Sequence, residues 1–257
     1  MALTGCLLTI DDSLVDRNDA GTTDASPTLD AGSEAIADAS SDVSTPPDAK
    51  SDAVTPDAGF CPKGAVFCDD FQSGSLSKWA PSGDFSSYGA VQSDPTIPGN
   101  QALHLTVPSM GNAWSSHADI LVTVPASGDV TISMKLMVNA SSGEIFPFGL
   151  FWSGLELAYR FGSPVKLTEQ GSTPFAAYDA PAPTANQWTT VTLVVHRAAG
   201  YVDVTAGANT KRCPASGMLG GAADLSKTQV HVDVGNFYAP SGTSWSGWID
   251  DVLVTSP

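Results

Sequence analysis

Two pairs of adjacent aspartates, Asp69-Asp70 and Asp250-Asp251, are the residues best suited to bind a cation. If the strands that carry them are neighbours, four like charges come together and require a cation or hydrogen-bond donors. Ca²⁺ accepts about six to eight oxygen ligands in irregular geometry, so the set predicts a structural calcium site. Successive residues of a strand point to opposite faces, so at most one aspartate of each pair can face that site. The alternative is that these carboxylates accept backbone N–H bonds and protect the sheet edges.

The other ionisable residues do not form a catalytic set. The four histidines, His104, His117, His196 and His231, lack the spacing of metal ligands. A retaining glycosidase needs two carboxyls about 5–5.5 Å apart, and Glu156 in GLELAYR is an isolated acid within its apolar run. No Gly-x-Ser-x-Gly nucleophile elbow occurs. We therefore predict no catalytic residue, and binding is favoured over catalysis.

The six tryptophans offer a different chemistry, the stacking of sugar rings. A sugar presents an apolar C–H face that packs on an aromatic ring, while the polar edges of Trp and Tyr still form hydrogen bonds. Several aromatic residues lie beside glycines and serines, where loops and strand ends are expected. We predict that a carbohydrate-binding face is lined by Trp114, Trp152, Tyr159, Arg160, Tyr238 and Trp245. The alternative for each of them is that it fills the protein core.

The scaffold for these groups must come from residues 60–257, where short apolar and β-branched runs alternate with Gly, Pro, Ser and Asn turns. No window shows sustained helical periodicity, although Gly217–Lys227 could form one helical turn. The predicted strands are Val66–Phe71, Ala102–Val107, Ala118–Val124, Val130–Val138, Phe146–Trp152, Leu155–Phe161, Thr189–Arg197, Tyr201–Ala206, Gln229–Gly235 and Gly247–Thr255. This pattern predicts an all-β domain, a two-sheet antiparallel β-sandwich or jelly roll.

Three segments resemble concanavalin A-like lectin/glucanase domains, the group that includes laminin G-like domains. FCDDFQSGSLSKW resembles their opening strand, NQWTTVTLVVHRAAGYVDVTAGA a later hairpin, and GWIDDVLVTSP their closing strand. The resemblance covers residues 64–257 and implies that the first and last strands lie side by side. It also implies that Trp79 and Trp188 are core residues, leaves Trp248 unassigned, and agrees with a structural Ca²⁺, which related domains often carry. The fold hosts lectins, hydrolases, lyases and adhesion modules, so it does not define the ligand.

The catalytic members of that fold carry motifs that this sequence lacks or matches only in part. Laminarinase-type enzymes have a Glu-x-Asp-x-x-Glu run on one strand face, and this run is absent. Alginate lyases use an Arg/Glu-rich strand, a Gln-x-His pair and a Tyr-rich final strand. The segment QVHVDVGNFY supplies Gln229, His231 and Tyr238, but the Arg/Glu-rich strand is missing. We interpret this partial match as coincidental.

The segment LTGC, which ends at Cys6, resembles the lipobox of bacterial lipoproteins, whose cysteine receives a diacylglycerol. Residues 1–6 would then be the remnant of a signal peptide. Only five residues precede Cys6 and none of them is basic, so we expect further signal-peptide sequence upstream of Met1. Several acyl chains on Cys6 would give a stable membrane anchor.

The three remaining cysteines are Cys61, Cys68 and Cys213. An exported protein lies in an oxidising compartment, where a disulfide is expected. A bond between Cys61 and Cys68 would close a short loop at the start of the folded domain. Pairing of Cys213 with either of them is the alternative.

Residues 7–59 are predicted to be a disordered acidic tether. In positions 11–58, Asp, Ala, Ser, Thr, Pro and Gly occupy 38 of 48 places, and no aromatic residue occurs. Such a segment cannot bury enough apolar surface to offset its ordering entropy, and its prolines and like charges keep it extended. The whole chain has a formal net charge of −16, which disfavours nucleic-acid binding.

Together these features predict a lipid-anchored protein of the cell envelope, in the outer membrane or on the cell surface, facing the periplasm or the exterior. We expect it to be a monomer. The leading prediction for its function is non-catalytic binding of a carbohydrate or another extracellular polymer. The alternatives are a structural or adhesion module that binds protein and a polysaccharide-cleaving hydrolase or lyase. Carbohydrate binding predicts a strip of exposed aromatic residues, and a protein-binding module predicts a larger apolar patch. An enzyme predicts two acids that converge on one site.

Overall fold

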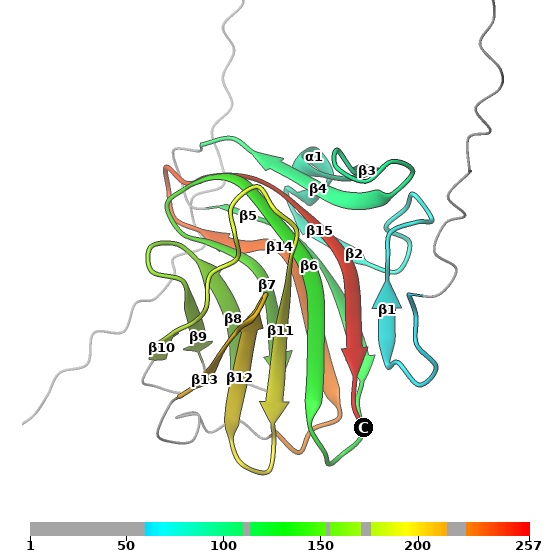
Figure 1. The fold of residues 1–257 in the computed structure, drawn as a ribbon, viewed down its shortest axis with the longest axis vertical. Helices are drawn as coiled ribbons and strands as arrows, with labels where there is room; N and C mark the ends of the chain where they lie inside the picture. Colours follow the sequence, from blue (N-terminus) through cyan, green and yellow to red (C-terminus); the bar gives the residue numbers. More distant parts are fainter. Residues whose placement is uncertain (1–59, 110–113, 153–154, 171–175, 215–224) are drawn as a thin grey trace, which may run out of the picture. The chain divides into compact units, whose positions relative to one another are not determined.

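The computed structural model describes residues 60–109, 114–152, 155–170, 176–214 and 225–257 (Figure 1). These residues form fifteen strands, arranged in two sheets with antiparallel pairing, and one short helix. The fold is the predicted all-β, two-sheet antiparallel β-sandwich. The helix, α1 (Phe85–Tyr88), has four residues, and no helix in the described part of the chain is long and apolar enough to cross a membrane.

Sheet A contains eight strands. Their order across the sheet is β13 (Asn209–Cys213), β12 (Tyr201–Ala206), β11 (Thr189–His196), β6 (Val130–Ser142), β15 (Ser244–Thr255), β4 (Gln101–Val107) and β3 (Gly89–Ser93), with β1 (Phe67–Asp69) also paired to β15. The first and last strands of the domain are therefore neighbours, as predicted, with Phe67 opposite Val254 and Asp69 opposite Val252.

Sheet B contains seven strands. Their order is β10 (Ala176–Asp179), β9 (Lys166–Gln170), β8 (Leu155–Phe161), β7 (Ile145–Trp152), β14 (Gln229–Ala239), β5 (Trp114–Thr123) and β2 (Ala80–Gly83). Strand β14, which contains most of the segment QVHVDVGNFY, pairs with β7 in this sheet.

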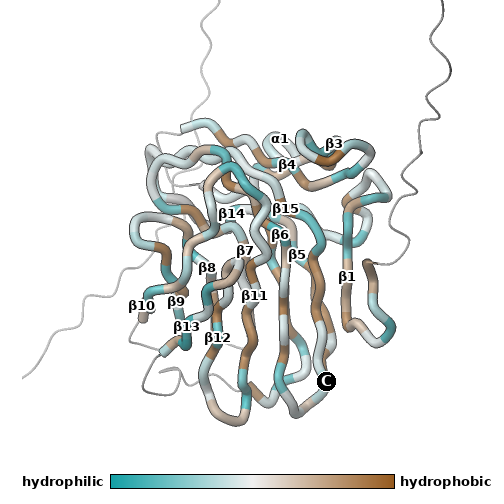
Figure 2. The backbone as a smooth tube through the Cα atoms, in the orientation of Figure 1, coloured by the Kyte–Doolittle hydropathy of each residue, from teal (hydrophilic) through white to brown (hydrophobic). Residues whose placement is uncertain are grey.

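The core lies between the sheets and is built by period-two alternation. In β6, Val130, Ile132, Met134 and Leu136 are fully buried, whereas the residues between them are partly exposed. Figure 2 shows hydrophobic residues recurring along the strands of both sheets. Complete burial of such a side chain stabilises the fold by about 1.5–3 kcal/mol. Because the inner faces are occupied by this packing, the outer faces are the surfaces that remain for function.

All ten strands predicted from the sequence occur, with boundaries that shift by a few residues. The prediction missed β2, β3, β9, β10 and β13. Strand β2 is exposed at every position, and β13 is buried only at its last residue, so neither carries an apolar alternation. The helix α1 was also missed, because four residues are too few to show a helical period. The helical turn expected at Gly217–Lys227 lies mostly outside the described residues.

Candidate functional site

The outer face of sheet B carries a concentration of ionisable side chains. In β14, Val230, Val232 and Val234 are buried in the core, so alternation directs His231 and Asp233 to the opposite face. In the neighbouring strand β5, the residue opposite Asp233 is Asp119. Similarly, His117 of β5 lies opposite Gly235, which has no side chain to cover it.

The centre of this face is recessed because the residues there have small side chains. On the other side of β14, Asp233 lies opposite Gly149 of β7, and Gly149 lies opposite Ala158 of β8. Gly235 adopts a φ of +106°, and a Cβ there would lie 2.7 Å from the backbone oxygen of Ser116. A larger residue at position 235 would therefore separate β14 from β5.

The central carboxyl, Asp233, is buried and poorly paired. It is 3% exposed, its Oδ2 has no hydrogen-bond partner in the described part of the chain, and its Oδ1 lies 3.8 Å from Nε2 of His117. Burial, with added repulsion from Asp119 and Glu156, raises the pKa of Asp233 to about 7. Burial also lowers the pKa of His117, although Asp119 opposes that shift. Near neutral pH this pair therefore carries less charge than two exposed side chains would.

Two further ionisable groups lie in the adjacent positions of the face. The Nδ1 of His231 is 3.2 Å from Oδ2 of Asp119, which links β14 to β5. Glu156 of β8 lies opposite Phe151 of β7, and burial raises the pKa of Glu156. The acids of this face thus sit on three different strands.

A depression of about 430 Å³ adjoins this ionisable cluster. It is lined by Leu121, Thr123, Phe151, Lys227, Thr228, Gln229 and His231. His231 lies opposite both Leu121 and Phe151, so these three side chains form a row across β5, β14 and β7. Leu121 is 48% exposed, and it places an apolar surface beside polar groups.

Three of the aromatic residues predicted to bind carbohydrate are core residues. Trp152, Tyr159 and Trp245 are at most 1% exposed. Trp152 donates its indole N–H to the backbone oxygen of Lys227 (2.9 Å), and Tyr159 donates its hydroxyl to that of Pro181 (2.7 Å). They fill the space between the sheets, as the alternative interpretation stated, because strand alternation turns them inward.

The other three predicted carbohydrate-binding residues do not form an aromatic surface either. Arg160 lies on the outer face of β8, but its Nη1 is 3.0 Å from Oε2 of Glu144. Trp114 begins β5 and Tyr238 lies near the end of β14, and their side chains lie outside the described residues. The predicted aromatic face is therefore not assembled by the side chains that the structure describes.

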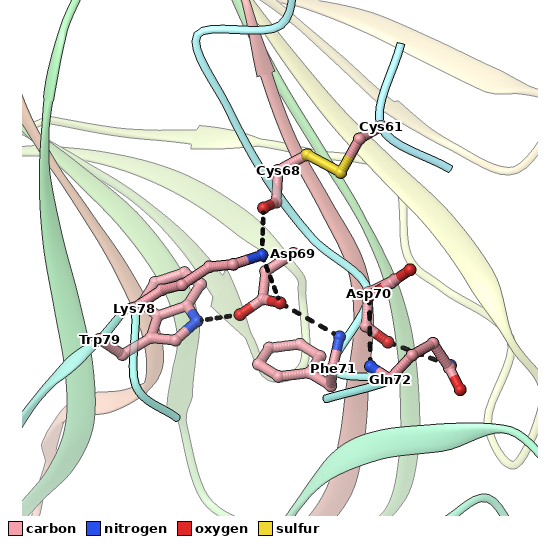
Figure 3. The surroundings of a disulfide bond; sticks show 8 residues. All are labelled: Cys61, Cys68, Asp69, Asp70, Phe71, Gln72, Lys78 and Trp79. Atoms are coloured by element: carbon pink, nitrogen blue, oxygen red, sulfur yellow. Dashed lines mark hydrogen bonds and ion pairs between the residues drawn. A yellow bond between two sulfur atoms is a disulfide. The ribbon is translucent and has the colours of Figure 1, made fainter. Parts of the chain in front are cut away.

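The aspartates of the first strand are held by protein donors (Figure 3). Asp69 accepts bonds from the indole N–H of Trp79 (2.7 Å), from Nζ of Lys78 (3.1 Å) and from the backbone N–H of Phe71 (3.3 Å). Asp70 caps the next turn through the backbone N–H of Gln72 (3.2 Å). Both carboxylates thus act as the alternative prediction described, bonding backbone and side-chain donors.

The aspartates of the last strand have separate partners. Asp250 accepts the side-chain N–H of Asn100 (2.8 Å) and the backbone N–H of Asp251 (2.8 Å), and burial raises its pKa to about 7. Asp251 lies at a bulge with φ of +50° and forms an ion pair with Lys135. No group of three or more metal-ligating side chains occurs among the described residues, so the four aspartates do not form one coordination sphere there. Calcium binding stays a prediction, which the effect of EDTA on the melting temperature tests.

Cys61 and Cys68 form a disulfide with a Cα–Cα distance of 5.7 Å (Figure 3). The bond ties the segment before β1 to β1 itself. Cys213 is buried at the end of β13 and is not disulfide-bonded. Burial raises the pKa of its thiol to about 11, so it is protonated at neutral pH. Cys6 and the tether, residues 7–59, lie outside the described residues.

Three residues of the ionisable cluster were not predicted as site residues from the sequence: His117, Asp119 and Asp233. A signal was present, because QVHVDVG places polar residues at every second position and SHADILV does so at His117 and Asp119. Alternation predicts that such residues share one face of a strand. What the sequence could not show is that these two strands are neighbours and in register. The residues Gln229 and His231, interpreted as a coincidental match, lie beside this cluster and line the depression.

Comparison with known proteins establishes the fold alone. No family model matches the sequence, and no curated protein matches it. Among solved structures, a cellulose-induced protein is similar with a TM-score of 0.51 at 17% identity, over 74% of this chain and 97% of that one. An alginate lyase from a Chlorella virus has a TM-score of 0.52 at 9% identity, over 75% of this chain and 100% of that one. A family 7 alginate lyase in complex with its substrate has a TM-score of 0.51 at 14% identity, over 76% and 97%.

Proposed function

We propose that this chain is a cell-envelope lipoprotein whose β-sandwich binds a glycan on the outer face of sheet B without cleaving it. The observation that carries the proposal is the row of Leu121, His231 and Phe151 beside the depression. The apolar face of a sugar can pack on Leu121 and Phe151, and sugar hydroxyls can bond the imidazole of His231. The depression thus combines two apolar side chains with polar ones, and small-ligand sites likewise pair apolar contacts with polar groups that orient the ligand.

Binding is favoured over cleavage because the acid with the most perturbed environment is beneath the surface. Asp233 is 3% exposed, so a bound sugar would meet the side chains around it rather than the carboxyl itself. A general acid must lie within hydrogen-bond reach of the group that it protonates. The other two acids of the face, Asp119 and Glu156, are on strands separated by β14 and β7.

The similar solved structures support a glycan as the ligand class. Two of them are alginate lyases, one of which was solved with its substrate bound. Their low sequence identity means that the support concerns the type of surface that this fold offers, not the particular sugar.

The location proposed for the protein rests on its N-terminal sequence. Lipidation of Cys6 would anchor the chain, and residues 7–59 would hold the domain away from the membrane. The test is mass spectrometry of protein expressed in a bacterium from the gene with its upstream in-frame sequence. An N-terminal acylated Cys6 is expected, and an unmodified Cys6 in the mature protein would contradict the proposal.

The glycan proposal is tested by screening the full chain against immobilised neutral and acidic glycans. Leu121→Ala is expected to reduce binding several-fold, because it removes apolar contact area from the depression. Ile97→Ala is the matched control, since Ile97 is also a large exposed apolar residue (43%) but does not line the depression. Equal effects of the two substitutions would contradict the assignment to sheet B.

The same screen distinguishes the alternative functions. If no glycan binds, a structural or protein-binding module becomes the better description. Release of new reducing ends or unsaturated products from a bound polysaccharide would instead identify an enzyme.

A further inference from the structure

A second depression, of about 370 Å³, lies at one end of sheet A, and its lining differs from that of the first. It lies where the segment before β11 meets the hairpin between β12 and β13. Its lining includes Gln187, Trp188, Thr190 and Asn209, and none of its described lining residues is charged. The resemblance to concanavalin A-like domains implied that Trp188 is a core residue. Instead Trp188 is only partly buried and forms part of the wall.

The ring of Trp188 is fixed in place by contacts on its polar edge. Its indole N–H lies 3.1 Å from Oδ2 of Asp94 and 3.0 Å from Oγ1 of Thr96. Asp94 is itself held, because its Oδ1 accepts the backbone N–H groups of Thr96 (2.6 Å) and Ile97 (3.2 Å). These bonds also lower the pKa of Asp94 despite its partial burial, so it stays ionised as an acceptor.

Packing fixes the same ring from a second direction. Trp188 contacts a small cluster on the outer side of sheet A that contains Ala102, Met137 and Trp248. The ring of Trp248 is in turn stacked on the imidazole of His104, with 4.1 Å between centroids. A side chain held this way loses little conformational freedom when a ligand packs against it, which favours binding.

The two walls of the depression are formed by turns whose positions are set by the backbone. Gly207 has a φ of +59°, as the two-residue turn between Ala206 and Asn209 requires, and its N–H bonds the oxygen of Thr190. On the other side, Asn186 has a φ of +57° and its N–H bonds the oxygen of Val138 (2.9 Å). These bonds position Gln187 and Asn209 on the two sides of the depression.

We propose that this depression, around Trp188, is a second carbohydrate-binding site, specific for an uncharged sugar. The indole ring supplies the apolar platform for a sugar C–H face. The amides of Gln187 and Asn209 and the hydroxyl of Thr190 each donate and accept hydrogen bonds, as sugar hydroxyls do. The absence of charge from the described lining provides no partner for the carboxylate of a uronic acid. The site does not depend on sheet B, whose depression has a different lining.

The test uses the full chain and neutral hexasaccharides of β-1,4-glucan, β-1,3-glucan, mannan and xylan, with an alginate hexasaccharide as the charged probe. Binding is followed by NMR through the indole N–H signal of Trp188, which is identified by its loss in Trp188→Phe. At least one neutral hexasaccharide is expected to shift that signal, and the alginate probe is not. The affinities of the variants are measured by titration calorimetry, because Trp188→Ala lacks the indole signal. Trp188→Ala is expected to weaken this binding about tenfold, and Asn209→Ala a few-fold.

Two comparisons keep the outcome interpretable. Asn209 is an exposed residue of an edge hairpin, so Asn209→Ala tests the site even if Trp188→Ala lowers the stability of the fold. Phe151→Ala, which alters the depression on sheet B, is expected to leave the Trp188 shift unchanged. If no neutral hexasaccharide shifts the Trp188 signal, the proposal is wrong. If binding is abolished by Phe151→Ala and unaffected by Trp188→Ala, the site on sheet A is wrong while that on sheet B is supported.

Discussion

The outer faces of the two sheets differ in the kind of polar group that they carry. Sheet B gathers His117, Asp119, His231 and Asp233 on two paired strands, and the pKa of Asp233 is raised to about 7. Sheet A instead presents an uncharged depression in which Trp188 is held by two hydrogen bonds. The ionisable cluster of sheet B therefore changes charge near neutral pH, whereas the depression on sheet A has an uncharged described lining that is positioned by packing and turns.

The difference shows how one sandwich can carry two unlike surfaces. Alternation commits every second residue to the shared core and leaves the intervening residues free to vary. The chemistry of each face then depends on which strands are neighbours. The predictions below test this contrast, from the largest expected effect to the smallest.

The largest effect is expected for Asp233→Asn. A carboxyl whose pKa rises on folding binds more protons in the folded state, so wild-type stability falls as the pH rises from about 4 to about 7. The substitution removes that loss. The free energy of unfolding of Asp233→Asn should exceed that of the wild type by roughly 4 kcal/mol at pH 8, and the two should converge near pH 4. Denaturant unfolding at both pH values measures this.

The matched control on sheet A is Asp250→Asn. Asp250 also has a pKa of about 7, but its two oxygens accept N–H bonds from Asn100 and Asp251. The side-chain amide of Asn has only one oxygen, so it can replace only one of these acceptors. We therefore expect Asp250→Asn to raise the free energy of unfolding at pH 8 by about 1 kcal/mol less than Asp233→Asn does. A larger gain for Asp250→Asn than for Asp233→Asn would reverse the contrast between the sheets.

Removal of the Cys61–Cys68 disulfide tests a covalent link that is found on sheet A. The bond joins residues separated by seven positions. Its loss in a Cys61→Ser, Cys68→Ser variant is expected to lower the free energy of unfolding by about 2 kcal/mol, because the unfolded chain gains entropy. Hydrogen exchange should increase first in β1. Cys213→Ala, which leaves the disulfide intact, serves as the control, and faster exchange in β1 of that variant would argue against a local role for the bond.

A smaller effect should separate the two buried tryptophans. The indole N–H of Trp152 bonds the oxygen of Lys227, whereas that of Trp245 has no hydrogen-bond partner among the described residues. Both Trp→Phe substitutions lose volume, but only Trp152→Phe also loses a hydrogen bond. We expect it to be the more destabilising by about 1 kcal/mol, measured by chemical unfolding. Equal losses for the two variants would mean that the bond to Lys227 contributes nothing.

The smallest effect concerns binding and pH. Ionisation of Asp233 adds one negative charge to sheet B as the pH rises through about 7. The affinity of that face for an acidic oligosaccharide should fall about twofold between pH 6 and pH 8. Binding of a neutral oligosaccharide at Trp188 should change less over the same range, because the ligand is uncharged and Asp250 is linked to Trp188 only through Asn100 and Asp94. Calorimetric titrations at the two pH values give both results, and equal changes at the two sites would mean that protonation does not distinguish them.

Much of the architecture could be predicted from the local sequence pattern. The strands and site residues that were not predicted have a common cause. Strands such as Tyr201–Ala206 were predicted to the residue, because half of each strand is buried and the alternation is clear. The strands that were missed include β2, which is exposed throughout and is ordered by pairing with β5. For the candidate site, Gln229 and His231 were noticed, but Asp233 was not, because its environment depends on Asp119 in another strand.

The sequence by itself determined the all-β class, the two-sheet sandwich and the pairing of its first and last strands. These follow from period-two alternation and from segments that resemble a known group of domains, which are local properties of the chain. Only the tertiary structure decided which aromatic residues are core and which line a surface. Trp152 ends the apolar strand β7, and Trp188 directly precedes β11, so both stand at the end of a strand. Trp152 points between the sheets, whereas Trp188 packs outside one of them. That choice depends on strand register and on partners such as Asp94 and Lys227, which are distant in the chain.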